Sequence, residues 1–337
     1  MTTTSRALWT TLGLLALGAT GCVVPSETPP VVDDDDDDDD DDSQDAGADC
    51  PELGPNRTVG LLQCDARREP GYTLFAPASS KSIWLIDEAG QVVHSWEAPA
   101  SPGLSVYLLP SGNLLHSSTH GNPGGLPAPP AGQGGRIREL SWEGDNVWSY
   151  THAGPDYEGH HDVEPLPNGN VLMLAWERHS MEEAIAAGRA PDSTSISEHG
   201  MWFEHVVEVN PSGEIVWMWR LYDHLVQDRD PDLPNFGDPR ASPGRLDVNT
   251  PGQAGYPGPA MDWNHANAVS YDEERDEIVI TALVQGEVWI IDHSTTTEEA
   301  ATSAGGRSGH GGDLLYRWGN PEVWGLQGER VLYGQHD

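Results

Sequence analysis

Near its middle the chain reads Asp162-Val163-Glu164-Pro165-Leu166-Pro167-Asn168-Gly169-Asn170-Val171-Leu172-Met173-Leu174-Ala175-Trp176. Two apolar runs flank Asn168-Gly169, and an Asn-Gly pair in this setting is a strong signal for a β-hairpin. Similar hairpins recur along the chain and predict four units of short strands. The predicted strands lie at residues 72–75, 82–87 and 92–96; 106–109, 114–116, 137–142 and 147–150; 162–166, 171–176, 205–210 and 215–219; and 268–271, 277–282, 287–292 and 314–318.

Repeated units of four strands predict an all-β fold, a β-propeller. A β-sandwich is the alternative, but the recurring strand with glycine, valine and tryptophan favours the propeller. Helical periodicity is confined to residues 181–188 and a turn near 297–303. Polar insertions at 177–204, 222–261 and 293–312 are expected to form loops on the blade faces. About four units are complete and a fifth would begin at residue 337, so we expect a truncated chain whose closing blades lie further on.

Residues 1–22 have the pattern of an export signal. Arg6 precedes an apolar stretch at 7–19 that is too short to span a membrane. It ends in Ala19-Thr20-Gly21-Cys22, which resembles a bacterial lipobox. We therefore expect acylation of Cys22 and an exported lipoprotein, held by its lipid anchor alone at the periplasmic face, the outer membrane or the cell surface. An ordinary signal peptide with an incidental cysteine is the alternative.

Residues 23–60 are predicted to be a disordered acidic linker ahead of a domain at 61–337. Ten consecutive aspartates at 33–42 repel one another into an extended chain. A spacer is the favoured interpretation and calcium capture the alternative, because the run lacks the glycine turn and mixed ligands of a shaped site. The net charge of -37 excludes nucleic acid as a partner.

Cys50 and Cys64 remain once Cys22 is assigned to the lipid anchor. In an exported protein a disulfide between them is plausible. We expect it to fasten the start of the domain and to have no catalytic role.

Three histidines, His161, His265 and His336, lie at the start of the first strand of a unit or immediately before it. In a propeller the first strand of every blade lines the central channel, so equivalent positions on different blades face one another. We therefore expect the three rings to converge. Asn267 lies two residues after His265, and alternate residues of a strand share a face, so these two side chains should project together.

Three imidazoles in a channel permit two kinds of chemistry. Three histidines and a water form a catalytic zinc arrangement. Alternatively, one histidine attacks an electrophile while the others hold charge and move protons. Asn267 fits the second better, because an amide N–H can stabilise a developing oxyanion whereas an amide is a poor zinc ligand.

Several motifs together resemble the bacterial arylsulfotransferases over roughly residues 71–337. They are Gly159-His160-His161-Asp162-Val163, Leu166-Pro167-Asn168-Gly169-Asn170, Asp262-Trp263-Asn264-His265-Ala266-Asn267, Trp289-Ile290-Ile291-Asp292-His293-Ser294-Thr295-Thr296-Thr297, Gly311-Gly312-Asp313-Leu314-Leu315-Tyr316-Arg317-Trp318-Gly319-Asn320-Pro321 and Gly334-Gln335-His336-Asp337.

The resemblance implies a six-bladed propeller that transfers a sulfuryl group from a phenolic sulfate ester to another phenol. It implies a sulfohistidine intermediate and neither a metal nor a cofactor. His336 matches the nucleophile, and His265 with Asn267 matches the pair that binds the sulfuryl oxygens and the leaving phenolate. The adjacent His160 and His161 match the remaining channel histidine; His161, next to the aspartate, is preferred as catalytic and His160 is assigned to substrate binding.

The sequence departs from the family pattern at Leu283, where studied members carry an arginine. Arg178 and Arg317 are the candidates to replace it on the sulfate, and Arg178 is preferred because Arg317 is expected on a strand further from the channel. Two other functions remain open: a non-catalytic surface propeller that binds a small ligand or a protein partner, and a zinc-dependent hydrolase.

Overall fold

The computed structural model describes residues 61–65, 71–78, 80–119, 126, 132–193, 197–250 and 261–336. The chain divides into two compact units, Met1–Gly47 and Ala48–Asp337, and the described residues all belong to the second. The predicted signal, Cys22, the aspartate run and Cys50 lie outside them. Cys64 is disulfide-bonded, but its pairing with Cys50 stays a prediction. Within these ranges no helix is long and apolar enough to cross a membrane.

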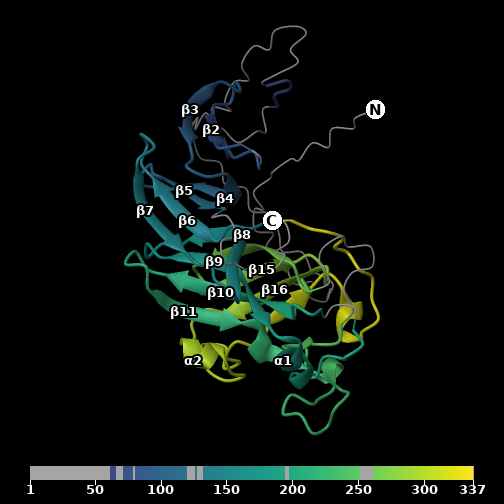
Figure 1. Cartoon of the computed structure of the whole chain (residues 1–337). Coiled ribbons are helices and arrows are strands. Elements are labelled where there is room, and N and C mark those ends of the chain that lie inside the picture. The colour runs from purple at the N-terminus through teal and green to yellow at the C-terminus, as the bar shows by residue number, and fades with distance from the viewer. Residues whose placement is uncertain are drawn as a thin grey trace, which may run out of the picture. The chain divides into compact units, whose positions relative to one another are not determined.

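The predicted all-β fold is confirmed. Four antiparallel sheets follow one another along the chain, and in each the strands pair in chain order (Figure 1). Their strands are β1 (Thr73–Phe75), β2 (Ser82–Ile86) and β3 (Val92–Glu97); β4 (Pro102–Leu108), β5 (Leu114–Ser118), β6 (Arg136–Leu140) and β7 (Asn146–Thr151); β8 (Tyr157–Pro165), β9 (Val171–His179), β10 (Met201–Val209) and β11 (Ile215–Arg220); and β14 (Ala266–Asp272), β15 (Glu277–Ala282), β16 (Glu287–Asp292) and β17 (Tyr316–Trp318).

The hairpin that opens the third sheet has the predicted turn. Gly169 adopts a φ of 85°, a conformation that glycine reaches without steric cost. Its N–H donates to the Leu166 carbonyl at 2.9 Å, and the Leu166 N–H donates to the Asn170 carbonyl at 2.8 Å. The turn sets the register of β8 against β9, where Pro165 pairs with Val171.

Each pair of consecutive sheets shares a hydrophobic core. Apolar residues of the first and second sheets form one cluster, those of the second and third another, and those of the third and fourth the largest. Tryptophans of the last strands join neighbouring units: the indole N–H of Trp96 donates to the Ser141 carbonyl at 3.1 Å, and that of Trp219 to the Gly312 carbonyl at 2.7 Å. The tryptophan-rich last strand therefore connects the first unit to the second and the third unit to the fourth.

The first strands of the four-stranded sheets lie side by side. Asp162 of β8 joins all three: Oδ2 accepts from the Val269 N–H of β14 at 3.0 Å, and Oδ1 accepts from the Tyr107 hydroxyl of β4 at 3.3 Å. Four-stranded antiparallel sheets that follow one another, share cores and bring their first strands together form the predicted β-propeller arrangement. Residues at the starts of β8 and β14 are thereby brought close in space.

The insertions contain the remaining elements. They are α1 (Met181–Ala186), η1 (Leu221–His224), the parallel pair β12 (Leu225–Val226) and β13 (Leu246–Asp247), η2 (Pro239–Ala241), α2 (Thr297–Ala300) and η3 (Pro321–Trp324). Both α-helices lie where short helical segments were expected. Each begins with a capping box, Ser180 with Glu183 and Thr296 with Glu299, which satisfies two N-terminal N–H groups reciprocally.

Candidate active site

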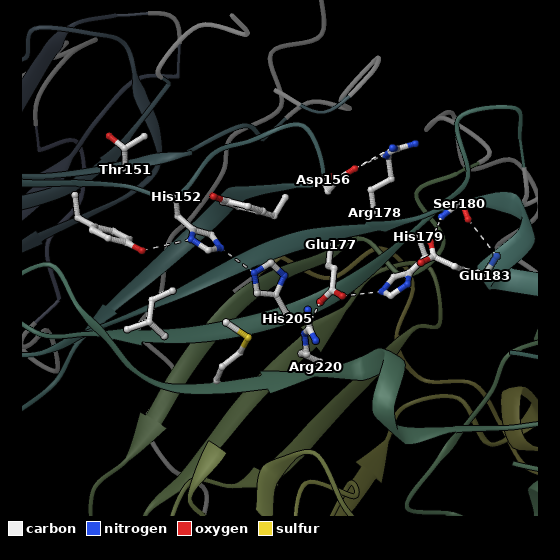
Figure 2. Close-up of a pocket in the computed structure, with 14 residues that line it drawn as sticks. Thr151, His152, Asp156, Glu177, Arg178, His179, Ser180, Glu183, His205 and Arg220 are labelled. Carbon is white, nitrogen blue, oxygen red and sulfur yellow. Dashed lines mark hydrogen bonds and ion pairs between the residues drawn. The ribbon is translucent and has the colours of Figure 1, made fainter. Parts of the chain in front are cut away.

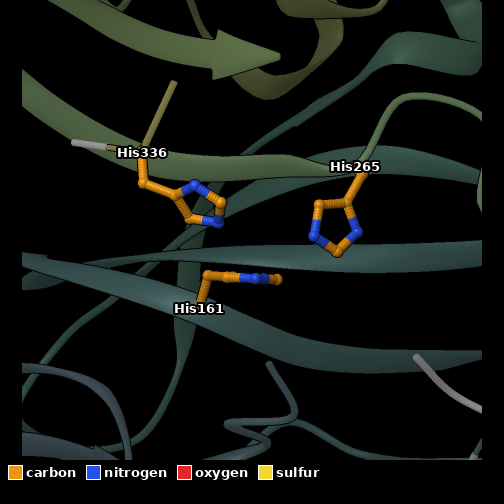
Figure 3. Close-up of side chains that lie close together, drawn as sticks. All are labelled: His161, His265 and His336. Atoms are coloured by element: carbon orange, nitrogen blue, oxygen red, sulfur yellow. The ribbon is translucent and has the colours of Figure 1, made fainter. Parts of the chain in front are cut away.

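Two groups of histidines are candidates for a site. His152 and His205 line a pocket of about 610 Å³ between the second and third sheets (Figure 2). His161, His265 and His336 form a separate cluster in which one ring nitrogen from each lies within 4.8 Å of the others (Figure 3). We call this second group the three-histidine cluster. It consists of the three residues whose convergence the sequence predicted.

His161 reaches the cluster through a bulge inside β8. The pairing with β9 passes from Gly159–Ala175 to Val163–Met173, so three residues of β8 face one residue of β9. His161 adopts a φ of 51°, a left-handed conformation that is strained for any residue but glycine. Its N–H donates to the Gly132 carbonyl at 2.6 Å. A Cβ on Gly132 would lie 2.1 Å from Cε1 of His161, so this close approach requires glycine.

His265 lies immediately before β14 and is also left-handed, with a φ of 47°. Its Nδ1 lies 2.5 Å from Oδ2 of Asp262, three residues earlier. The buried carboxylate keeps the proton on Nδ1 and fixes the plane of the ring. The Leu283 N–H donates to the His265 carbonyl at 3.2 Å, which ties this segment to the turn after β15.

His336 is exposed and comes from the segment after η3. Two side-chain amides hold that segment. Nδ2 of Asn267 donates to the Gln335 carbonyl at 2.7 Å, and Nε2 of Gln335 donates to the Ala282 carbonyl at 2.9 Å. Asn267 thus contacts the residue next to His336.

His160 lies behind His161. Its Nδ1 is 2.9 Å from Nδ1 of His161, and its Nε2 is 2.9 Å from Oε2 of Glu204. Its ring stacks on Trp176 at 3.9 Å between centroids and 9° between planes. Because both of its ring nitrogens are engaged within the protein, His160 supports His161 and does not face the cluster. The sequence had assigned His160 to substrate binding.

Burial sets the protonation of this chain of groups. Burial, followed by His160, His265 and His336, holds the pKa of His161 well below its usual value, so that ring is neutral at physiological pH. Burial also lowers the pKa of His160, with the nearby His265 acting in the same direction. Burial raises the pKa of Glu204, and the charge of Asp262 raises it further. Glu204 is therefore a buried carboxyl that can hold a proton.

Arg178 lies in the pocket of Figure 2. Its Nε and Nη2 donate to Oδ1 of Asp156 at 3.0 and 2.9 Å, and its Nη1 donates to the His199 carbonyl at 3.2 Å. Arg317 is buried in an ion pair with Glu287 at 2.7 Å. Among the described residues, the guanidinium groups of both candidates therefore contact groups outside the three-histidine cluster. Leu283 is a buried, uncharged side chain.

The pocket of Figure 2 has its own polar chemistry. Nε2 of His152 and Nε2 of His205 lie 2.9 Å apart, and burial lowers the pKa of His152 to about 4. Glu177 accepts from His179 at 2.7 Å and from Arg220 at 2.9 Å. Its arginines are thus neutralised by carboxylates, which leaves little net attraction for an anion.

Sequence reasoning gave no role to Asp262, which holds the ring of His265, or to Glu204, which holds the ring of His160 behind the cluster. Asp262 had one usable signal, its position three residues before His265. Glu204 had none, because it lies 62 residues from its partner Ala266 and meets it only across sheets. The assembled site offers imidazole nitrogens that can attack an electrophile, move protons or bind a metal ion.

Comparison with known proteins gives two findings. A sequence model of the family described as Arylsulfotransferase (ASST) matches residues 66–299. The chain is 31% identical over 145 residues to the arylsulfate sulfotransferase AssT of Escherichia coli O6:H1. This match covers 39% of the chain and 22% of the relative, so the chain aligns with about a fifth of that protein's length.

Solved structures show lower similarity. The hydrazine synthase of Kuenenia stuttgartiensis is 14% identical with a TM-score of 0.41, over 74% of this chain and 59% of that one. Virginiamycin B lyase of Staphylococcus aureus is 10% identical with a TM-score of 0.33, over 66% of this chain and 50% of that one.

Proposed function

Because the chain belongs to the arylsulfotransferase family, we propose that it transfers a sulfuryl group from a phenolic sulfate ester to a phenolic acceptor. The family match spans more than half of the chain. The observation that carries the proposal is the convergence of His161, His265 and His336 within 4.8 Å. Three rings at this spacing can surround a single tetrahedral anion.

His336 is the proposed nucleophile. It is the exposed member of the cluster and so the one that an incoming ester meets first. A ring nitrogen of neutral His336 attacks the sulfur, an N–S bond forms, and the S–O bond to the phenol breaks with its electron pair on the phenolate. The acceptor phenol then attacks the sulfur of the sulfohistidine, and the N–S bond breaks to regenerate His336.

His265 is the proposed proton donor to the departing phenolate. Asp262, 2.5 Å from Nδ1, holds the ring of His265, so its other nitrogen is the one that would pass a proton to the leaving oxygen. In the second half-reaction the same ring takes the proton of the acceptor phenol. Protonated His265 also supplies a positive charge beside the sulfuryl oxygens, which Leu283 cannot do.

Glu204, His160 and His161 form a proposed proton relay behind the cluster. The two contacts in the chain, Glu204 with His160 and His160 with His161, are both 2.9 Å. When Glu204 is ionised, Nε2 of His160 donates to Glu204 and Nδ1 of His161 donates to Nδ1 of His160, so Nε2 of His161 is an acceptor. When Glu204 holds the proton, both hydrogen bonds reverse and Nε2 of His161 becomes a donor.

The proposed reaction takes place outside the cytoplasm. The export signal and lipobox expected at residues 1–22 and Cys22 would anchor the enzyme to a membrane by lipid alone. Substrates would then be phenolic esters and phenols that reach the cell envelope.

The test is transfer from 4-nitrophenyl sulfate to phenol by the chelator-treated full chain, followed through release of 4-nitrophenol. We expect phenol-dependent turnover and, without acceptor, a burst with sulfation of His336 detectable by mass spectrometry. His336→Ala should abolish both, and His310→Ala, at an exposed histidine in another loop, should leave both unchanged. A folded chain that binds the ester without turnover would support the non-catalytic alternative.

A further inference from the structure

We propose that the three-histidine cluster is also a binding site for a divalent transition-metal ion of the Zn²⁺ class. The cluster presents one nitrogen from each of three imidazoles within 4.8 Å. Three histidine nitrogens are a common protein ligand set for Zn²⁺, with water or a substrate in the fourth position. In the described part of the chain this is the one group of three or more histidine, cysteine or acidic side chains that converges in this way.

The second layer around the cluster has the composition of a metal site. Metal-binding histidines usually donate their other N–H to a carboxylate or carbonyl, which fixes the ring and increases its basicity. Asp262 makes this contact to Nδ1 of His265 at 2.5 Å. His161 is held through its own Nδ1 by His160, which in turn contacts the buried Glu204. Two of the three rings are therefore oriented by chains that end in a carboxylate.

The backbone also orients these two ligands. His161 and His265 both adopt left-handed φ angles, 51° and 47°. The two rings lie edge to face, with 4.7 Å between centroids and 84° between planes. Two strained histidines this close require a surrounding structure that fixes them, and such strain is concentrated at ligand-binding positions. The third ring, His336, lies on an exposed segment held through Asn267 and Gln335, where a small movement has little steric cost.

The distances allow closure on an ion. Zn–N bonds of about 2.0–2.1 Å in a tetrahedral site place the nitrogens roughly 3.3 Å apart. Starting from separations of at most 4.8 Å, each ring has to move by about 1 Å or less. Figure 3 shows the rings of His265 and His336 on either side of that of His161, with ring nitrogens directed into the space between them.

A carboxylate behind the cluster suits a cation. Asp262 contacts Nδ1 of His265. Leu283 brings no positive charge. Imidazole ligands suit zinc, copper and nickel among the first-row metals, so Zn²⁺ is the appropriate first probe.

One consequence rests on the proposed function. A metal ion on His336 uses the same lone pair that would attack sulfur, so bound Zn²⁺ and sulfuryl transfer exclude each other. The metal-free protein is then the active transferase, and Zn²⁺ is an inhibitor that competes with the aryl sulfate.

The experiment measures Zn²⁺ binding to the full chain after removal of metal with a chelator. Isothermal titration and competition with a chromophoric chelator give stoichiometry and affinity, and Co²⁺ reports four-coordinate geometry through its visible absorption. We expect one tight site that weakens at least 100-fold in His265→Ala and in His336→Ala. His310→Ala should bind as the parent does.

The His336→Ala variant keeps the ten aspartates of residues 33–42. Any Zn²⁺ that these aspartates bind is therefore measured in this variant as weak residual binding. Because His336 is exposed, this variant tests the site without disturbing the core. Binding that is equally tight in the parent, His265→Ala and His336→Ala would overturn the proposal, as would no tight site in the parent. Transfer measured in the metal-free protein tests the proposed function separately. Turnover by a protein that does not bind Zn²⁺ would contradict only the proposed metal site. Zn²⁺ binding by a protein without turnover would contradict only the proposed transferase activity.

Discussion

At the residue scale, Asn267 illustrates how a predicted site residue can serve a different purpose. Its Nδ2 donates to the Gln335 carbonyl, and its Oδ1 accepts a short hydrogen bond from the Thr281 hydroxyl. Both ends of the amide are therefore used within the protein. We infer that Asn267 positions the segment of His336, whereas the sequence suggested direct contact with the sulfuryl oxygens.

Replacing Asn267 by alanine should uncouple His336 from β14. We expect kcat for aryl sulfate transfer to fall about 10- to 100-fold with little change in KM, because a misplacement of about 1 Å is enough for such losses. The free energy of unfolding should fall by about 1 kcal/mol for the lost hydrogen bond. Thr281→Val is the matched control: it removes the other partner of Asn267 but keeps the contact to Gln335. An unchanged kcat in Asn267→Ala would contradict the positioning role.

Glu204→Gln tests the proton relay. Glutamine keeps the shape and can still accept from the Ala266 N–H, but it cannot exchange a proton with His160. We expect kcat to fall about 100-fold, the scale of lost acid–base catalysis, and the pH–rate profile to change its shape. Glu214→Gln, at an exposed turn, should leave the profile of the parent. A profile that is merely lowered, with its shape kept, would indicate a purely structural Glu204.

The sequence predicted the convergence of the three histidines, but strand alternation was the wrong reason for pairing His265 with Asn267. His265 precedes β14 in a left-handed conformation, and the register shifts between Ala266 and Ala268. A bulge of this kind reverses which face a side chain occupies, and alternation cannot reveal it. The repeat still predicted that the three histidines converge, because the first strands of successive units lie together whether or not one of them contains a bulge.

At the element scale, the hairpins were predictable because turn chemistry is local. Glycines with positive φ stand at the predicted turns, among them Gly90, Gly112, Gly169 and Gly213. The extent of β8, from Tyr157 to Pro165, was not predictable, because its first half pairs with the end of β9 across the bulge. Glu204 was missed for a similar reason: its partner Ala266 lies in the next sheet, so the contact depends on how the sheets pack.

A polar clamp joins the third and fourth sheets at the ends of β10 and β16. Nε2 of His293 lies 3.0 Å from Glu208, and its Nδ1 lies 2.8 Å from Asp276. Burial lowers the pKa of His293, but the hydrogen bonds to Glu208 and Asp276 outweigh burial and raise it overall. The clamp is therefore strongest when His293 is protonated.

The clamp predicts a loss of stability on the alkaline side. A raised folded pKa contributes stability that is full below the unfolded value of about 6.5 and is lost as pH rises through the folded value. Urea midpoints measured from pH 6 to 9 should therefore decline in the parent. His293→Gln should lose on the order of 1–3 kcal/mol at pH 6 and show a flatter decline. An equal decline in both proteins would remove His293 as its cause.

At the scale of the whole molecule, each sheet completes its core only against its neighbours. Buried histidines lie within these shared layers: His116 on β5 is fully buried, and His152 follows β7 beside His205 of β10. Burial lowers the pKa of His116 to about 4 and that of His152 to about 4 as well. Unfolding at mildly acidic pH must therefore take up protons at several places at once.

This uptake predicts that the fold weakens between about pH 6.5 and 4. For a group whose folded pKa is depressed, stability is present above the unfolded value and is lost as pH falls through the folded one. A shift from 6.5 to about 4 corresponds to about 3 kcal/mol for each of His116 and His152. The carboxylates with lowered pKa values, such as Glu208 and Asp292, act only below about pH 4.5. Burial raises the pKa values of Glu164 and Glu204, and these two carboxyls oppose the loss, so the loss between about pH 6.5 and 5 belongs to the histidines.

Urea unfolding of the chelator-treated chain at pH 7, 6 and 5 measures this loss. The slope of the unfolding free energy against pH gives the number of protons taken up, which we expect to exceed one between pH 6 and 5. His152→Gln should reduce the slope because it removes one buried titrating group, and the control variant His310→Ala, at an exposed histidine, should keep the slope of the parent. Equal midpoints at pH 7 and 5 would contradict this net uptake, and the neutral His161 that the proposed relay and metal site share would then need to be measured directly by NMR.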